Sequence, residues 1–587
     1  MTRFLFIHIY YYIYLIALVI ITSLSSCSKK DISLVEGVNI VLILTDDQGW
    51  GDVGFNGNVT IETPLIDSVA EQSVVFNRFY VSPVCAPTRA SLLTGKYHLA
   101  TGTSWVTHRK EVMRSSEVTL AEILQSHGYK TACFGKWHNG AQYPHNPNGQ
   151  GFDSFFGFSA GHWNNYFDTQ LEYNGKMVQT KGYLPNVLTD SVVSFIGRNA
   201  NSPFFAYVAY NTPHTPYQVP DKYFNKYKNK GLDDKTACIY GMNENIDDNI
   251  ERIFQELDNK NLSENTIFIF MSDNGPNYLR YNGGFKGRKA QVDEGGIRVP
   301  FLLHYPNGEF PASVVDNMVA HIDVLPTILD ICNISLNDSL VIDGISFKPL
   351  LENKVNELPD RYFYTHHVMR EFDTFPGAIR TDKHLLTITP TDTSLYNLQT
   401  DPFQKVDISY RAPYTTERLL LEYKKWFCEV TKNGIKPEPI HINSDSNHTT
   451  LLPSHEAYLS GGTTFYGKDG WANDWSVGNG KLAWNIKVNQ EGKYKVTALY
   501  SGSESNTTIK IRCGKQNRLV PIKEVKVAPI IPSNDWVTRD EVYERAWHKI
   551  DLGEIYLIPG DTNLKLEVRN PKKQAQTEIK SIIIKRI

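Results

Sequence analysis

Four short apolar runs, each followed immediately by a polar loop, constrain the fold of this chain more than any other feature. The runs occupy residues 38–44, 131–134, 203–210 and 266–271. Unbroken apolar runs of this length are typical of strands buried on both faces, as in parallel sheets. Helical patterns lie between them, at 120–127 and 246–257. The sequence therefore predicts an α/β fold with a mostly parallel central sheet flanked by helices.

The loops that follow these runs carry charged, amide and imidazole side chains. Their sequences are TDDQGWGD after residue 44, GKWHNG after 134, NTPHTP after 210 and SDNGPN after 271. In an open α/β sheet, binding sites lie beyond the carboxyl ends of the strands. We therefore expect these loops to meet at a single site.

One set of side chains in these loops offers only oxygen atoms. Its members are Asp46, Asp47, Asp273 and Asn274. Carboxylates packed together repel one another, and a divalent cation relieves that repulsion. Ligands that are all oxygen favour Ca²⁺, with Mg²⁺ as the alternative, over zinc. The plainer interpretation of the Asp46–Asp47 pair is a helix N-cap or a solvated turn.

A second set is cationic or can become so: Lys136, His138, His214 and Lys289. Lysine and histidine suit a tetrahedral sulfate or phosphate, as charges and as proton donors. The competing interpretations are a structural histidine at 138, beside Trp137, and a solvated loop lysine at 289. With the oxygen set, this set predicts a site for a sulfate or phosphate group.

The chain is long enough for two or three domains, because it has 587 residues. A strand and turn at 395–401 and a helix at 416–431 close the α/β unit. A polar linker is expected at 433–450 and an all-β sandwich at 451–587, where strand-like alternation and five tryptophans gather. Those tryptophans either fill the core of the sandwich or stack on sugar rings in a carbohydrate-binding-like module.

The N-terminal sequence is typical of a targeting segment. Residues 4–21 are apolar and LSSC at 24–27 resembles a bacterial lipobox, which predicts a lipoprotein signal peptide over 1–26 and lipidation of Cys27. The alternative is an uncleaved membrane anchor; in either case the protein is exported, to the periplasm or the cell surface. The formal net charge of −3 excludes the global positive field that recruits nucleic acid.

The cysteines show no CxxC or zinc-binding spacing. Cys133, Cys238 and Cys332 lie in apolar contexts and are expected in the core. Cys85 differs, because prolines flank it in the stretch VCAPTRASLLTG. Cys85 lies at an expected helix start, near Arg89, in a protein that is expected to be exported. This position indicates a special role for the Cys85 side chain.

At this point the motifs resemble those of a known family, the type I sulfatases of the alkaline phosphatase superfamily. CAPTR at 85–89 fits the family's C-x-P-x-R signature, and LTDDQGWGD, GKWHNG, MSDNG and DEGGIRVP resemble its other motifs in the same order. The similarity implies an alkaline phosphatase-like catalytic domain over 37–432, with a C-terminal subdomain from about 355. It does not extend to the C-terminal module.

The resemblance implies that a maturation enzyme oxidises Cys85 to formylglycine, whose hydrated form attacks the sulfur atom. It implies a Ca²⁺ site formed by Asp46, Asp47, Asp273, Asn274 and the modified Cys85. Arg89 would hold this centre, and Lys136 and Lys289 would bind sulfate oxygens. His138 would accept a proton during sulfate release, and His214 would stand near the leaving oxygen.

The resemblance also implies a sulfated glycan substrate, and the similarity favours a sulfate on galactose or N-acetylgalactosamine. The loop at 161–168 is expected to shape substrate selection, and Ser159 to lie near the sulfate. Asn139 and Asp293 depart from the family pattern. The rival hypotheses are a phosphomonoester or phosphonate-ester hydrolase of the same superfamily and an inactive glycan-binding lipoprotein.

Overall fold

The computed structural model describes residues 37–308, 310–368, 372–442, 449–461, 463–465, 472–473, 480–502, 507–523, 526–539, 541–569 and 577–587. The predicted signal peptide 1–26 and Cys27 lie outside the described residues, as do Trp471 and Trp475. Among the described residues, no helix has the length and apolar character needed to span a bilayer. The six described cysteines are all free thiols.

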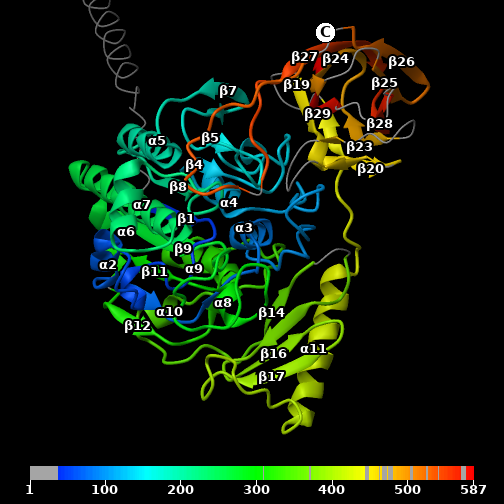
Figure 1. Cartoon of the computed structure of the whole chain (residues 1–587). Helices are drawn as coiled ribbons and strands as arrows, with labels where there is room; N and C mark the ends of the chain where they lie inside the picture. The colour runs from blue at the N-terminus through cyan, green and yellow to red at the C-terminus, as the bar shows by residue number, and fades with distance from the viewer. Residues whose placement is uncertain are drawn as a thin grey trace, which may run out of the picture.

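A ten-stranded sheet forms the centre of the catalytic domain (Figure 1). Its strands, in spatial order, are β12 (Ser313–Val315), β2 (Val74–Phe76), β11 (Phe301–His304), β9 (Thr266–Ser272), β1 (Asn39–Thr45), β8 (Phe204–Ala209), β4 (Lys130–Lys136), β5 (Ser154–Phe158), β6 (Gln170–Tyr173) and β7 (Lys176–Gln179). The five central strands, β9 to β5, run parallel, whereas β11, β6 and β7 pair antiparallel. The four predicted strands are thus neighbours, as expected for an α/β fold.

Helices cover both faces of this sheet (Figure 1). On one face lie α2 (Pro64–Ala70), α5 (Leu184–Arg198), α6 (Asp221–Asn229) and α7 (Asp234–Asn259); on the other lie α3 (Cys85–Thr94), α4 (Leu120–Ser126), α9 (Val324–Ile331) and α10 (Lys348–Leu351). Alternate residues of β1 serve the two cores, since Val41 and Ile43 face the first and Ile40 and Leu42 the second. The helix predicted at 246–257 begins earlier, because Asp233 caps it.

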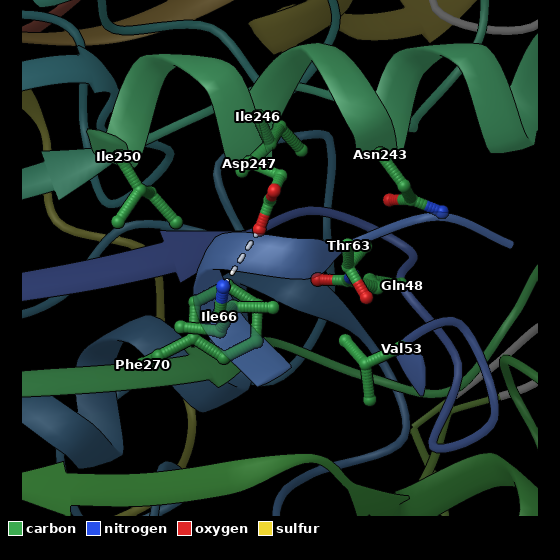
Figure 2. A pocket seen from close by; sticks show the side chains of 9 residues that line it. All are labelled: Gln48, Val53, Thr63, Ile66, Asn243, Ile246, Asp247, Ile250 and Phe270. Carbon is green, nitrogen blue, oxygen red and sulfur yellow. Dashed lines mark hydrogen bonds between the residues drawn. The ribbon is translucent and has the colours of Figure 1, made fainter. Parts of the chain in front are cut away.

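A carboxylate on α7 fixes the start of α2 (Figure 2). Asp247 accepts hydrogen bonds from the backbone N–H groups of Leu65 and Ile66, at 3.0 and 2.8 Å. Figure 2 shows the hydrogen bond to Ile66, in a pocket that Asn243 and Gln48 also line. Burial raises the pKa of Asp247 to about 7. The loop after β1, which carries Gln48, therefore rests on a helix pair whose contact involves a buried, titratable group.

Smaller elements complete the domain. They are β3 (Phe79–Tyr80), β10 (Arg298–Val299) and β13 (Val319–Ala320), which form a small sheet, and α8 (Glu294–Ile297). A four-stranded antiparallel sheet follows, made of β14 (Phe363–His366), β15 (Gly377–Arg380), β16 (His384–Ile388) and β17 (Thr393–Asn397), with α11 (Pro413–Thr431) beside it. The predicted strand and turn at 395–401 and the helix at 416–431 fall here.

The C-terminal module contains two six-stranded sheets that share one core. The first holds β18 (Ile440–Ile442), β20 (Tyr458–Ser460), β23 (Lys481–Val488), β25 (Thr508–Cys513), β26 (Gln516–Pro521) and β28 (Gly560–Arg569). The second holds β19 (Thr449–Pro453), β21 (Thr464–Phe465), β22 (Ala472–Asn473), β24 (Gly492–Gly502), β27 (His548–Leu557) and β29 (Thr577–Arg586). The predicted β-sandwich is present.

The expected linker at 433–450 is shorter than its polar composition indicated. Ile440 and Ile442 are fully buried, and β18 pairs in parallel with β23. An alternating apolar–polar–apolar triplet is enough for an edge strand, and the module therefore begins by residue 440. Trp484 is buried in the sandwich core, where its indole N–H donates to the Pro453 carbonyl.

Candidate active site

The loops after β1, β4, β8 and β9 meet at the carboxyl edge of the parallel strands, as the sequence predicts. Cys85, the first residue of α3, lies at the same place. Ligand atoms of Asp46, Cys85 and Asp273 lie within 4.8 Å of one another, and so do those of Asp46, Asp47 and His214. Residues from five separate stretches of the chain therefore share one buried site.

The oxygen set has the properties of a cation site. Asp46 Oδ1, Asp47 Oδ2 and Asn274 Oδ1 are buried, and no hydrogen-bond donor contacts them. Burial and the charge of Asp46 raise the pKa of Asp273 well above its usual range, although Arg89 opposes this. Buried polar atoms normally have partners, so these oxygens and this repulsion fit a hard divalent cation. Together with the Cys85 side chain, they are the residues that could hold it.

Two buried cations contact the carboxylates of the oxygen set. Arg89 donates from Nε and Nη2 to Asp273 Oδ2, at 3.1 and 2.7 Å, and from Nη1 to the Lys136 carbonyl. Lys136 Nζ lies 2.6 Å from Asp46 Oδ2. Burial raises the pKa of Asp46, but Lys136 and the other nearby cations outweigh it and hold the pKa well below its usual range. Asp46 is therefore ionised, as a metal ligand requires.

Lys289 comes from the long loop after β9 and contacts a different carboxylate of the set. Its ammonium contacts Asp47 Oδ1, which also accepts a hydrogen bond from Asn274 Nδ2 at 2.8 Å. Burial lowers the pKa of Lys289, but the charge of Asp47 outweighs it and the pKa is raised. Lys289 is thus not a solvated loop lysine. It adds a third positive charge beside the oxygen set, after those of Arg89 and Lys136.

The structure fixes the ring of His138 through one nitrogen only. His138 Nε2 lies 2.8 Å from the Val106 carbonyl, so it must carry the proton and donate, and Nδ1 is an acceptor. Nδ1 is buried without a hydrogen-bond partner. Burial and the charge of Lys136 hold the pKa of His138 well below its usual range. The neutral ring therefore presents a free lone pair at the site.

His214 stands beside the metal ligands. Its Nδ1 lies 2.7 Å from the Thr215 carbonyl, and its Nε2 lies 3.9 Å from Asp47 Oδ2. The ring of His162 is its neighbour, with centroids 5.7 Å apart. Nδ1 donates to a carbonyl, so Nε2 is the nitrogen that can exchange a proton at the site.

The residues outside the family pattern have structural partners. Asn139 Nδ2 donates to the carbonyls of Ala86 and Glu111, which ties the loop after β4 to the residue that follows Cys85. Asp293 accepts from Gln404 and lies 3.3 Å from Lys286. The Ser159 carbonyl accepts from the His138 backbone N–H, and its hydroxyl is buried.

Sequence reasoning missed several residues of the site. Val106 supplies only a carbonyl, which no side-chain pattern reveals. His162 lies within the loop 161–168 that was expected to shape substrate selection, but no spacing rule marked it. Glu541 lies in the C-terminal module, yet its Oε1 accepts a 2.6 Å hydrogen bond from Thr215, next to His214. The assembly of two domains brings it there, and no local motif carries that information.

Comparison with known proteins agrees with this geometry. The sequence model of the sulfatase family matches residues 38–334, and that of the N-sulphoglucosamine sulphohydrolase C-terminal region matches 285–426. The ulvan-active sulfatase of Formosa agariphila is 30% identical over 449 residues, which cover 70% of this chain and 85% of that protein. The N-acetylgalactosamine-6-sulfatase of Mus musculus is 31% identical over 372 residues, which cover 56% of this chain and 69% of that protein.

Among solved structures, Ps i-CgsB in complex with k-i-k-neocarrahexaose superposes with a TM-score of 0.63 at 30% identity. The match covers 67% of this chain and 93% of that one. The sulfatase family model alone spans half of the chain, and the metal-ligand geometry, the cationic set and Cys85 all lie within it or at its edges. The chain therefore belongs to the sulfatase family of the alkaline phosphatase superfamily, and it is a sulfatase.

Proposed function

We propose that this sulfatase removes sulfate from a glycan through a formylglycine derived from Cys85 and a divalent metal ion, Ca²⁺ rather than Mg²⁺. The observation that carries the proposal is the position of Cys85. It opens α3, it is buried, and its side chain shares one ligand cluster with Asp46 and Asp273. A structural cysteine would lie among apolar side chains instead.

Formylglycine would supply, once hydrated, one hydroxyl that attacks sulfur and a second whose loss of a proton expels sulfate. The metal would lower the pKa of the hydrated formylglycine and polarise a sulfate oxygen. Asp46, Asp47, Asp273 and Asn274 would hold the metal, with the modified Cys85. Arg89 would keep Asp273 in place, since it holds that carboxylate through two nitrogens.

The other side chains have positions that suit proton and charge handling. Lys136, beside Asp46, and Lys289, beside Asp47, would bind sulfate oxygens. His138 would accept the proton of the second hydroxyl at Nδ1, because Nε2 is held by the Val106 carbonyl. His214 would give a proton to the leaving oxygen from Nε2, with the charge of Lys289 beside it.

The relatives support a sulfated glycan as the substrate class. The names of similar proteins specify ulvan, N-acetylgalactosamine 6-sulfate and a neocarrahexaose. We therefore place the substrate among sulfated galactose or N-acetylgalactosamine units of a polysaccharide. We also propose that the protein is an exported lipoprotein, anchored through Cys27 at the periplasmic face or the cell surface.

Sulfate release tests this function. The protein, produced together with a sulfatase-maturation enzyme, is incubated with sulfated galactans and with sulfated N-acetylgalactosamine, and free sulfate is measured by ion chromatography. We expect release by wild type and none by Cys85→Ala. Parallel assays with a phosphate monoester and a phosphonate monoester must be at least a hundredfold slower; a faster rate on either would replace the sulfatase assignment by the rival one.

A further inference from the structure

A long connection from the C-terminal module crosses to the catalytic domain. It joins β26 to β27 and descends over the region of β5 and β8 (Figure 1, orange). We call residues 532–547 the crossing segment; all of it except residue 540 is described. It contacts the loop 161–168 and the loop that follows His214. These are the two loops that border the candidate active site on the side away from β9.

The crossing segment is firmly packed against the catalytic domain. Trp536 stacks on Phe224, with ring centroids 3.7 Å apart and planes 7° from parallel. Its indole N–H donates to the Val219 carbonyl at 2.8 Å, and its backbone N–H donates to the Tyr217 carbonyl. Trp536 is thus an anchor between domains and its ring face is covered. The Phe224 contact and the indole hydrogen bond give Trp536 a structural role between the domains.

Charged and amide contacts hold the loop 161–168 against the same segment. Arg539 donates to the Asn164 carbonyl at 2.6 Å, and the Asn164 amide donates to Glu544 at 3.0 Å. Arg539 is itself fixed by Asp535 in a buried ion pair. Since each of these groups has a defined partner, the segment and the loop form one rigid wall rather than two independent surfaces.

Glu541 occupies the point of this wall nearest to the site. It accepts a 2.6 Å hydrogen bond from the Thr215 hydroxyl, and the preceding residue, His214, reaches within 3.9 Å of Asp47. Burial raises the pKa of Glu541, but the Thr215 hydroxyl and the charges of His162 and His214 outweigh it. The pKa therefore stays below its usual range, and Glu541 is an anion beside two imidazoles.

A carboxylate at this place weakens the binding of the sulfate group itself, because like charges repel. It is not one of the oxygens around Cys85, and it comes from a domain outside the family match. Besides holding Thr215, it is therefore placed to contact the part of the substrate that carries no sulfate. Sugar hydroxyls are donors, and a charged acceptor binds them more strongly than a neutral one does.

We propose that Glu541 is a specificity-determining residue, which accepts hydrogen bonds from hydroxyl groups of the sugar that carries the sulfate, next to His162 and His214. The C-terminal module is then a part of the active site and not a separate tether. The inference rests on the proposed function and narrows it. The site would favour a sugar with free hydroxyls there and disfavour one with a second sulfate or a carboxylate.

Glu541→Gln isolates the charge, because the amide oxygen can still accept from Thr215. Full-length matured enzyme is assayed with 4-methylumbelliferyl sulfate, which has no sugar hydroxyls, and with methyl galactoside and methyl N-acetylgalactosaminide sulfates. We expect kcat/KM on the best sugar sulfate to fall about tenfold, mainly through KM, with a much smaller change on the aryl sulfate. A second sulfate on the same sugar should be tolerated about tenfold better than by wild type.

The matched control is Asp551→Asn, which removes an exposed carboxylate of the same module, paired with Lys495. It should keep the wild-type ratio of sugar to aryl activity. Binding of the same sugar sulfate by calorimetry, in a Cys85→Ala background, should weaken about tenfold on adding Glu541→Gln. An equal loss on both substrates, or an unchanged ratio and affinity, would overturn the proposal.

Two further results distinguish a failure of the proposed role of Glu541 from a failure of the proposed function. Wild-type enzyme that hydrolyses the aryl sulfate but neither binds nor cleaves any sugar sulfate would also overturn the role of Glu541. Matured wild type that hydrolyses no sulfate at all, yet binds the sugar sulfate in a manner that depends on Glu541, would contradict the proposed function alone.

Discussion

At the scale of single residues, the site is a balance of buried charges. The three carboxylates and the amide of the oxygen set lie beside Arg89, Lys136 and Lys289. Three oxygens of this set still have no hydrogen-bond donor. Burial and the charge of Asp46 raise the pKa of Asp273, so this carboxylate is held at a cost in spite of the cationic side chains beside it. A bound divalent cation would complete the balance.

Calcium should therefore stabilise the folded protein. After treatment with a chelator, adding Ca²⁺ at a hundred times its dissociation constant should stabilise the wild type by about 2.7 kcal/mol, which thermal unfolding detects as a higher Tm. Asp47→Asn removes a ligand charge and should reduce this shift. Asp551→Asn, far from the site, should keep it. An equal shift in all three proteins would show that the ion binds elsewhere.

His138 can be tested without replacing it, through the glycine on which its ring rests. A Cβ atom added at Gly161 would lie 2.0 Å from His138 Nε2, where the bond to Val106 forms. Gly161→Ala should therefore displace the ring and lower kcat by about a hundredfold, the order expected for losing a general base. Gly197→Ala serves as control, because its Cβ meets only the flexible ends of the Glu256 and Lys260 side chains. Wild-type kcat in Gly161→Ala would remove His138 from the mechanism.

At the scale of elements, the order of strands decides which loops meet. β9, β1, β8 and β4 are adjacent and parallel, so their carboxyl ends align at one edge. Each strand is a short apolar run that sequence patterns identify well. The contact of α2 with α7, by contrast, depends on Asp247, a carboxylate that sequence alone would assign to a helix surface.

The stability of this contact should depend on pH. Since burial raises the pKa of Asp247 to about 7, the folded state holds its proton after the unfolded state has lost it. The contribution of Asp247 is thus full below its unfolded pKa and is lost as pH rises toward 7. Between pH 5 and 8, wild type should lose about 3 kcal/mol more unfolding free energy than Asp247→Asn in urea titrations.

The control for this experiment is Glu251→Gln, on the exposed side of the same helix, which should follow the wild-type pH curve. Parallel curves for wild type and Asp247→Asn would mean that Asp247 is ionised in the folded protein at pH 5.

Much of the fold, and the grouping of Asp46, Asp47, Asp273 and Asn274, could be predicted from the sequence, because both rest on local patterns. Strand β1 and the Asp46–Asp47 pair are adjacent in the chain, as are β9 and Asp273. The linker was predicted too long, since the triplet of β18 is too short to stand out from its polar neighbours. Val106 and Glu541 could not be found, because their roles depend on tertiary contacts between segments 32 and 326 residues apart in sequence.

At the scale of the whole molecule, the two domains share buried polar contacts. Arg109 of the catalytic domain lies 3.0 Å from Glu456 of the module, and both side chains are 2% exposed. Gln142 donates to the same carboxylate, and the backbone carbonyl of Glu438 accepts from Arg109 Nε. The Arg109 contacts and those of the crossing segment hold the module against the catalytic domain at two places.

Removing Arg109 should loosen the module, because it leaves the Glu456 carboxylate buried without its charge partner. Arg109→Met should cost about 3–5 kcal/mol of unfolding free energy and increase proteolysis at residues 433–439. The double variant Arg109→Met/Glu456→Met should recover part of this loss, since it removes both charges. Additive losses in the double variant would show that the two side chains do not act as a pair.

The central claim is that Cys85 is the precursor of the nucleophile, and a mass measurement tests it most directly. Trypsin should release residues 79–89, FYVSPVCAPTR, from protein matured in a host that has a sulfatase-maturation enzyme. Conversion of the thiol to an aldehyde lowers the mass of this peptide by about 18 Da. We predict the lighter peptide in active wild type; unmodified cysteine in protein that releases sulfate at full rate would contradict the account.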